Sequence, residues 1–136
     1  VTYAQGMQQL VYASDTYGYE LNLETIAKIW RGGCIIRAEL LEKMRLAFDK
    51  NPKLESLLLD ERFAEELNPP IGAATKVVST GMNNGIPLAS MSAGLNYFNA
   101  FRSGRLPMNL VQAQRDHFGS HTYERLDREG LFHTEW

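Results

Sequence analysis

The sequence predicts an all-α fold, a multi-helix domain followed by an extended C-terminal tail. Along most of the 136 residues, apolar side chains recur at spacings of three and four, which places them on one face of a helix. Glycine and proline residues interrupt this pattern, and no period-2 alternation flanks the Asn84-Gly85 turn, which argues against a hairpin there. We therefore divide the chain into a helical domain, residues 1–118, and a tail, residues 119–136.

Three amphipathic helices are predicted in the first third of the chain, over residues 3–18, 22–33 and 36–50. Asn22 is a suitable N-cap for the second of them, because its side chain can accept a hydrogen bond from the first turn. Glu24 lies in that turn, where a carboxylate suits the positive end of the helix dipole. The third helix has the clearest separation of apolar and charged positions.

Shorter helices are predicted in the rest of the domain. Asp60 is expected to cap a brief helix that ends at residues 68–70, because the Asn-Pro-Pro sequence there removes backbone donors and restricts the preceding residue. Helices over 71–82, 88–103 and 107–118 follow, and Pro107 suits the start of the last one.

The tail beyond Gly119 has no sustained apolar period. It mixes charged residues, a glycine and scattered aromatics, so we expect an extended segment that a few large side chains anchor. The expected anchors are Tyr123, Leu131, Phe132 and Trp136.

Composition excludes several classes of partner. Fourteen basic and sixteen acidic residues give a net charge of -2, so no overall positive field attracts nucleic acid. No apolar run reaches the roughly 18 residues of a membrane span, and we expect no membrane partner. The single cysteine, Cys34, cannot form a disulfide within the chain, which favours a reducing, cytoplasmic setting. The chain opens within a helical pattern, and we expect it to be a fragment of a longer protein.

Some residues that could carry chemistry have a more common structural role. Cys34 could be a nucleophile, but it opens a helix beside two isoleucines, where a buried thiol is the commoner occupant. His117 and His121 have the spacing of a helical metal pair, yet Gly119 between them is expected to end the helix. The glycines nowhere form a G-x-G-x-x-G motif, so no dinucleotide site is predicted in this chain. We expect no catalytic residue and no metal ligand within it.

Two segments could bind an anion. Arg31 and Arg37 flank a glycine break, whose amides could face an anion or whose glycines could only permit close helix packing. Arg115 offers a planar fork for a phosphate, and His121 lies just past the end of the same helix. Spacing alone leaves Arg115 and His121 open to an alternative role, in which they satisfy the end of their own helix.

Several sequence segments resemble the 6-phosphogluconate dehydrogenases. One is the W-R-G-G-C-I-I-R stretch at residues 30–37, and another is the Q-A-Q-R-D-x-F-G-x-H-T-Y-E segment at residues 112–124. The similarity extends over essentially the whole chain. His117 stands where tyrosine is usual in this family, Ser120 where alanine is common, and Asn99-Ala100 replaces a common Asp-Gly.

The resemblance implies oxidative decarboxylation of 6-phosphogluconate to ribulose 5-phosphate and CO2 with reduction of NADP. It implies that an N-terminal domain upstream of Val1 holds NADP, and that a lysine base and a glutamate acid also lie upstream. Within this chain it implies that Arg115 binds the substrate phosphate and that His121 is a second substrate contact. Both would be delivered by the tail into the neighbouring subunit of a homodimer, and the fragment alone is expected to be inactive.

Two alternatives remain at this point. The chain could be a helical dimerisation or docking module with no chemistry of its own. It could also belong to a related β-hydroxyacid dehydrogenase with a non-phosphorylated substrate, which would not need Arg115.

Overall fold

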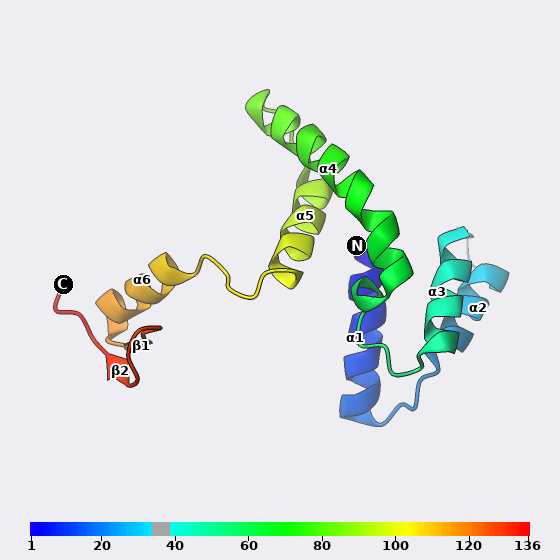
Figure 1. The fold of residues 1–136 in the computed structure, drawn as a ribbon, viewed down its shortest axis with the longest axis horizontal. Helices are drawn as coiled ribbons and strands as arrows, with labels where there is room; N and C mark the ends of the chain where they lie inside the picture. The colour runs from blue at the N-terminus through cyan, green and yellow to red at the C-terminus, as the bar shows by residue number, and fades with distance from the viewer. Residues whose placement is uncertain (34–38) are drawn as a thin grey trace. The chain divides into compact units, whose positions relative to one another are not determined.

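The computed structural model describes residues 1–33 and 39–136, and Figure 1 shows its helices and strands. The chain forms two compact units, unit 1 over Val1–Asn99 and unit 2 over Ala100–Trp136. Helices dominate, which confirms the all-α fold class. Cys34 and Arg37, two candidates from the sequence, lie outside the described residues.

Unit 1 begins with helices α1 (Thr2–Tyr17), α2 (Leu23–Gly33) and α3 (Glu39–Lys50). Helix α1 ends where predicted, since Gly18 adopts a left-handed conformation with φ of 64° that suits a residue without a Cβ. The predicted cap of α2 is confirmed, because the amide of Thr25 donates to Asn22 Oδ1 at 2.8 Å. Helices α2 and α3 lie side by side (Figure 1).

The prediction that a brief helix ends at Asn68-Pro69-Pro70 is wrong. Helix α4 runs without interruption from Glu61 to Asn83, with Pro69 and Pro70 inside it, after the short 3-10 turn η1 (Leu57–Leu59). Both prolines are exposed, so water can hydrate the carbonyls whose amide partners are missing, and the φ of proline is compatible with a helix. The cap at the start of α4 is as predicted, because the Phe63 amide donates to Asp60 Oδ1 at 3.1 Å.

Helix α5 (Ala89–Phe101) follows α4 after a tight turn that needs two glycines. Gly85 has a φ of 68°, and the Ile86 amide donates to the Gly81 carbonyl at 2.8 Å. A Cβ added at Gly81 would lie 2.5 Å from Leu88 Cδ1, so the absence of a side chain lets the turn close onto α4. The helix ends two residues before the predicted Ser103.

The apolar core of the described chain lies entirely in unit 1. Its members are under 10% exposed and come mainly from α1, α2, α3 and the segment around η1. They are Ala4, Met7, Leu23, Ala27, Leu41, Met44, Ala47, Phe48, Leu54, Leu57, Leu58, Phe63, Val78 and Leu95. Unit 2, all of whose residues are described, buries no apolar side chain to this degree, so polar contacts must supply much of its order.

Unit 2 consists of helix α6 (Asn109–Gly119) and two short strands, β1 (Tyr123–Glu124) and β2 (Leu131–Phe132). The strands pair antiparallel, with Tyr123 opposite Phe132 and Glu124 opposite Leu131. Helix α6 ends at Gly119, as predicted. The sequence did not predict the strand pair, because two-residue strands are too short to show an alternating pattern.

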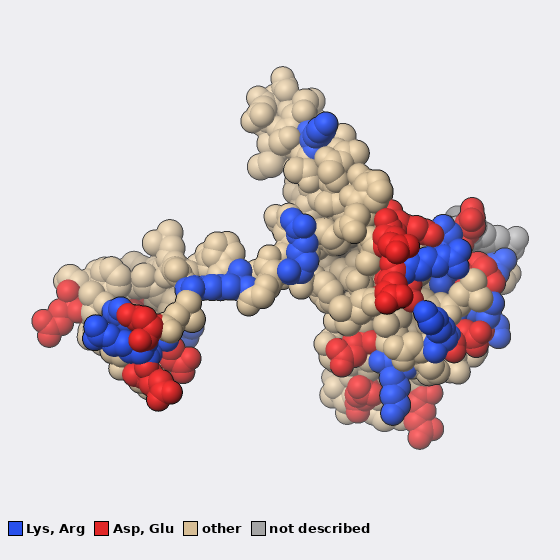
Figure 2. All heavy atoms as spheres, in the orientation of Figure 1, with Lys and Arg blue, Asp and Glu red and all other residues tan. Residues whose placement is uncertain are grey.

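Charge is distributed unevenly along the first five helices. Acidic and basic side chains are mixed over α2, α3 and the start of α4, whereas Lys76 is the only Lys, Arg, Asp or Glu from Leu67 to Phe101 (Figure 2). Several large apolar side chains of this charge-poor segment are exposed, including Val77, Met82 and Met91. In the part of the chain that the structure describes, no helix is both long enough and apolar enough to cross a membrane.

Candidate functional site

Helix α6 presents the predicted phosphate ligand, Arg115, to solvent. Its guanidinium donates to Gln112 Oε1, one turn earlier, at 3.1 Å, and the side chain is otherwise exposed. The helix face that turns toward the strands carries Gln112, Ala113 and Asp116, which are partly or fully buried. Leu110 and Phe118, two large apolar side chains of the same helix, are instead 80% and 78% exposed.

Asp116 is completely buried and accepts four hydrogen bonds. Its Oδ1 receives the Thr122 amide at 3.0 Å and His133 Nδ1 at 2.9 Å. Its Oδ2 receives the Thr134 amide at 3.0 Å and Trp136 Nε1 at 3.2 Å. We call these five residues the Asp116 cluster. It joins α6 to the turn after the helix and to the end of the chain.

The donors around Asp116 keep it ionised. Burial by itself would raise the pKa of this carboxyl, since a low-dielectric environment penalises the charge. The hydrogen bonds from His133, Thr134 and Trp136 outweigh burial and lower the pKa to about 2, from an ordinary value of 3.8. A buried carboxylate is therefore stable here because its lone pairs are satisfied.

His121 lies in a tight turn whose backbone is unusual. Ser120 and Thr122, on either side of it, have positive φ values of 50° and 59°. The turn begins at the helix end, where the Ser120 amide donates to the Asp116 carbonyl at 2.9 Å. The imidazole ring occupies the space beside Gly119, and an added Cβ on that glycine would lie 2.9 Å from His121 Nε2.

The strand pair is held by aromatic and polar contacts. The rings of Tyr123 and Phe132 lie 6.2 Å apart, and the Arg125 guanidinium lies 5.6 Å from the centre of the Phe132 ring. The Tyr123 hydroxyl and the Thr134 hydroxyl are 2.8 Å apart. Of the predicted anchors, Tyr123 and Phe132 make these contacts, whereas Leu131 is 72% exposed.

A cavity of about 470 Å³ is lined by residues of α6, of β1 and of the loop after β1. Arg105, Gln112 and Arg125 contribute polar groups to its wall, but neither Arg115 nor His121 lines it. The two predicted ligands are both exposed, and they lie on the same unit within six residues of each other in sequence.

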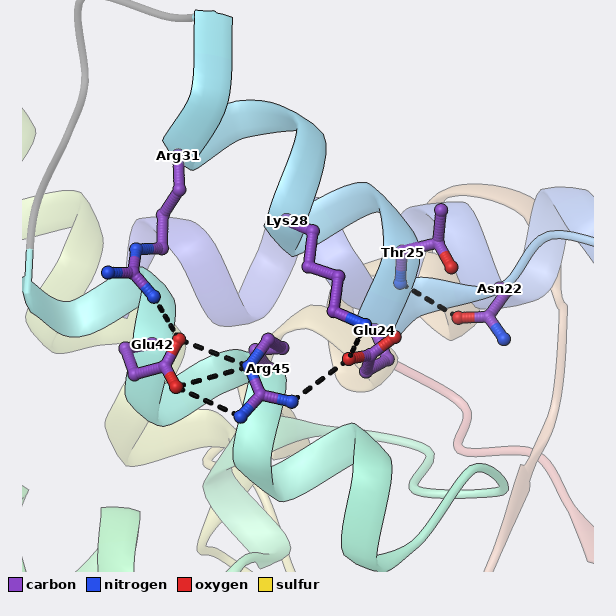
Figure 3. Close-up of polar contacts among 7 residues, drawn as sticks. All are labelled: Asn22, Glu24, Thr25, Lys28, Arg31, Glu42 and Arg45. Carbon is purple, nitrogen blue, oxygen red and sulfur yellow. Dashed lines mark hydrogen bonds and ion pairs between the residues drawn. The ribbon is translucent and has the colours of Figure 1, made fainter.

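The other predicted anion site, around Arg31, belongs to an ion-pair network between α2 and α3 (Figure 3). Arg45 contacts Glu24 at 3.0 Å and Glu42 at 2.9 Å, Arg31 pairs with Glu42, and Lys28 contacts Glu24 at 2.7 Å. We call this group, Glu24, Lys28, Arg31, Glu42 and Arg45, the α2–α3 ion network. Its arginines are committed to carboxylates, which favours the local structural role for Arg31.

The pKa values of this network follow from its pairing. The hydrogen bond from Lys28, followed by the one from Arg45, lowers the pKa of Glu24. The hydrogen bond from Arg45 lowers the pKa of Glu42, and the same carboxylates raise the pKa of Arg45. Glu24, Glu42 and Arg45 are therefore charged at neutral pH.

No metal site is evident in the described residues, where no three His, Cys, Asp or Glu side chains gather. His117 and His121 do not share a helical face, because α6 ends at Gly119 between them. The His117 ring instead meets the Trp136 ring edge-on at 5.6 Å.

Sequence reasoning missed Asp116 and Gln112, which support the turn around His121. Both side chains bind the backbone of Thr122. Gln112 Nε2 donates to its carbonyl at 2.6 Å, and Asp116 accepts from its amide. The spacing of Gln112, Ala113 and Asp116 was the available signal, because it marks one helix face. Because Gln112 and Asp116 on this face are polar, a search for apolar residues at helical spacing does not find it.

These observations define a class: a helical domain in which helix α6 and the turn that follows it expose an arginine and a histidine. The family model described as "6-phosphogluconate dehydrogenase, C-terminal domain" matches residues 1–136. The chain therefore belongs to the 6-phosphogluconate dehydrogenase C-terminal domain family.

Individual relatives agree with this assignment. The NADP(+)-dependent, decarboxylating 6-phosphogluconate dehydrogenase of Bacillus subtilis is 49% identical over 135 residues, which are 99% of this chain and 29% of the relative. The decarboxylating enzyme 1 of Oryza sativa subsp. japonica is 51% identical, with 99% and 28% covered. A solved structure of the Plasmodium falciparum enzyme, studied in apo form and with NADP+ or 6-phosphogluconate, has a TM-score of 0.85 at 48% identity and covers 98% of this chain and 29% of that one. The chain thus spans under a third of these relatives.

Proposed function

We propose that this chain is the C-terminal part of an NADP-dependent enzyme that oxidatively decarboxylates 6-phosphogluconate to ribulose 5-phosphate and CO2. The activities of its relatives support this proposal, together with identities near 50% over 99% of the chain. In the intact enzyme, NADP is held by the N-terminal domain, because this sequence carries no glycine-rich dinucleotide motif. These residues alone bring no acid or base for the reaction.

Within this enzyme, Arg115 binds the phosphate of 6-phosphogluconate and His121 is a second substrate contact. One observation carries this proposal: the Arg115 guanidinium is exposed and, among the described residues, meets only a neutral glutamine, Gln112. By contrast, Arg31, Arg45 and Arg125 each pair with a carboxylate. A guanidinium that is not neutralised can form two parallel hydrogen bonds with phosphate oxygens.

The enzyme works as a homodimer in which the tail enters the site of the neighbouring subunit. The charge-poor segment from Leu67 to Phe101, with its exposed Val77, Met82 and Met91, supports a large apolar contact surface. The exposure of both Arg115 and His121 supports a site that another part of the assembly completes.

A reducing compartment, the cytoplasm, suits the single cysteine.

The substitution Arg115→Ala in the full-length enzyme tests the phosphate contact. A charge-assisted contact contributes about 1.5 to 3 kcal/mol, so we expect the KM for 6-phosphogluconate to rise by about 10- to 150-fold. The KM for NADP should be unchanged. Steady-state kinetics with each substrate varied in turn would measure both.

A matched control is Arg62→Ala, which removes an exposed arginine of α4 that pairs only loosely with Glu66, at 3.7 Å. It should leave both KM values unaltered. If Arg115→Ala behaves like Arg62→Ala, Arg115 has only a structural role at its helix end and the proposed phosphate contact is wrong.

A further inference from the structure

Two side-chain hydrogen bonds hold the turn that carries His121, and both go to the backbone of the next residue, Thr122. The Thr122 amide donates to Asp116 Oδ1 at 3.0 Å, and the Thr122 carbonyl accepts from Gln112 Nε2 at 2.6 Å. Thr122 is β-branched and has a φ of 59°, a conformation that costs free energy for such a residue. These two hydrogen bonds offset that cost and hold the backbone of the turn in one conformation.

The same carboxylate ties this turn to the end of the chain. Asp116 also accepts from His133, from the Thr134 amide and from Trp136 Nε1, at 2.9, 3.0 and 3.2 Å. Because unit 2 buries no apolar side chain below 10% exposure, Asp116 is the one fully buried anchor of this unit. The position of the turn thus depends on a single charged group on α6.

Gly119 supplies the space for the imidazole ring. A Cβ at this position would lie 2.9 Å from both Cδ2 and Nε2 of His121, closer than real Cβ contacts allow. The φ of Gly119 is not positive, and the residue is the last of helix α6. Its backbone would therefore accept alanine, and the His121 ring would have to move to make room for the methyl group.

We propose that Asp116 and Gly119 are positioning residues for His121: Asp116 fixes the backbone of the 120–122 turn, and Gly119 leaves free the space that the ring occupies. This inference rests on the proposed role of His121 as a substrate contact. Neither positioning residue touches substrate, and each acts through the place of the imidazole.

The deciding variant is Gly119→Ala in the full-length enzyme. Alanine favours a helix more than glycine does, so the fold should be retained or slightly stabilised. The added methyl group displaces the His121 ring, and we expect the KM for 6-phosphogluconate to rise about tenfold, since small misplacements at a binding site are costly. The KM for NADP should not change. The matched control, Gly104→Ala, adds a methyl group in the same unit where no atom lies within 4 Å of it, and it should have no effect.

A double-mutant cycle with His121→Ala separates positioning from other effects. With the ring removed, Gly119→Ala should no longer alter the KM for 6-phosphogluconate. Asp116→Asn keeps the size of the side chain but presents an amide to N–H donors. It should likewise raise the KM for 6-phosphogluconate in the wild-type background, and raise it much less in the His121→Ala background.

Each result has one meaning. If His121→Ala itself leaves the KM for 6-phosphogluconate unchanged, the proposed substrate contact fails. If His121→Ala raises that KM but Gly119→Ala does not, the positioning role of Gly119 is overturned. An effect of Asp116→Asn that is equally large in both backgrounds would make Asp116 a general stabiliser of the tail and overturn its part of the inference.

Discussion

The Asp116 cluster and the α2–α3 ion network use similar side chains in opposite surroundings. Asp116 is completely buried, and each of its hydrogen bonds reaches a different residue of the turn or the chain end. In the α2–α3 ion network, Arg31 and Lys28 are half exposed or more, so water competes for their charges, and Arg45 and Glu24 are still 20% and 15% exposed. Helices α2 and α3 also bury Leu41, Met44 and Ala27 beside this network, whereas unit 2 has no such apolar support. The same kind of chemistry should therefore matter much more in unit 2 than in unit 1.

The largest expected effect is on removal of the carboxylate at residue 116. The substitution Asp116→Ala leaves four partly buried donors without their acceptor, and donors that lose a charged acceptor are costly. We expect amide exchange in residues 120–136 of the full-length enzyme to accelerate by about 100-fold, with little change in α2 and α3. Hydrogen–deuterium exchange followed by mass spectrometry would show it. Unchanged protection of the tail would mean that its order comes from contacts outside the Asp116 cluster.

An intermediate effect is expected on lowering the pH. The pKa of Asp116 in the folded chain is about 2, below the ordinary 3.8, so the folded state favours the ionised form. This stabilisation is complete above about pH 4 and is lost as the pH falls from 4 toward 2. Cleavage of the tail by pepsin should rise across this interval in the wild-type enzyme. The Asp116→Asn variant should be cleaved readily at pH 4 already and change less, and equal pH dependence of the two proteins would contradict this assignment.

The smallest effect is expected for Arg45→Met, which removes the central cation of the α2–α3 ion network but keeps an apolar stem. Exposed and partly exposed ion pairs contribute little, so Tm should fall by less than about 3 °C. Leu41→Ala is the comparison on the same helix, because it leaves a cavity in the core and should destabilise by about 2 to 5 kcal/mol. Thermal unfolding followed by circular dichroism measures both. Similar losses for the two variants would show that the network, and not the core, holds α2 and α3 together.

Helix ends were predictable from the sequence because each depends on a few neighbouring residues. Gly18, Asn22 and Asp60 all act as the local pattern indicated. The break predicted at Pro69-Pro70 was wrong because the solvation of freed carbonyls depends on exposure, which the local sequence does not specify.

The candidate site was less accessible to sequence reasoning. Arg115 and His121 could be named as candidates from their residue types, but spacing alone favoured a role at the end of their own helix, and only the resemblance to a family favoured substrate binding. The Asp116 cluster was missed because its donors lie between 6 and 20 residues away from Asp116, and only the folded chain brings them to one carboxylate.

Within unit 1, the hydroxyl of Tyr97 donates to Gln8 Oε1 at 2.6 Å and so links α5 to α1 across 89 positions of the chain. Closing a loop of that length is entropically unfavourable until intervening contacts have formed, whereas α2 and α3 are near neighbours in sequence. We therefore expect the α2–α3 pair to assemble early in folding and the Gln8–Tyr97 bond to form late. During synthesis on the ribosome, helices α1 and α5 could therefore become partners only after most of unit 1 had been made.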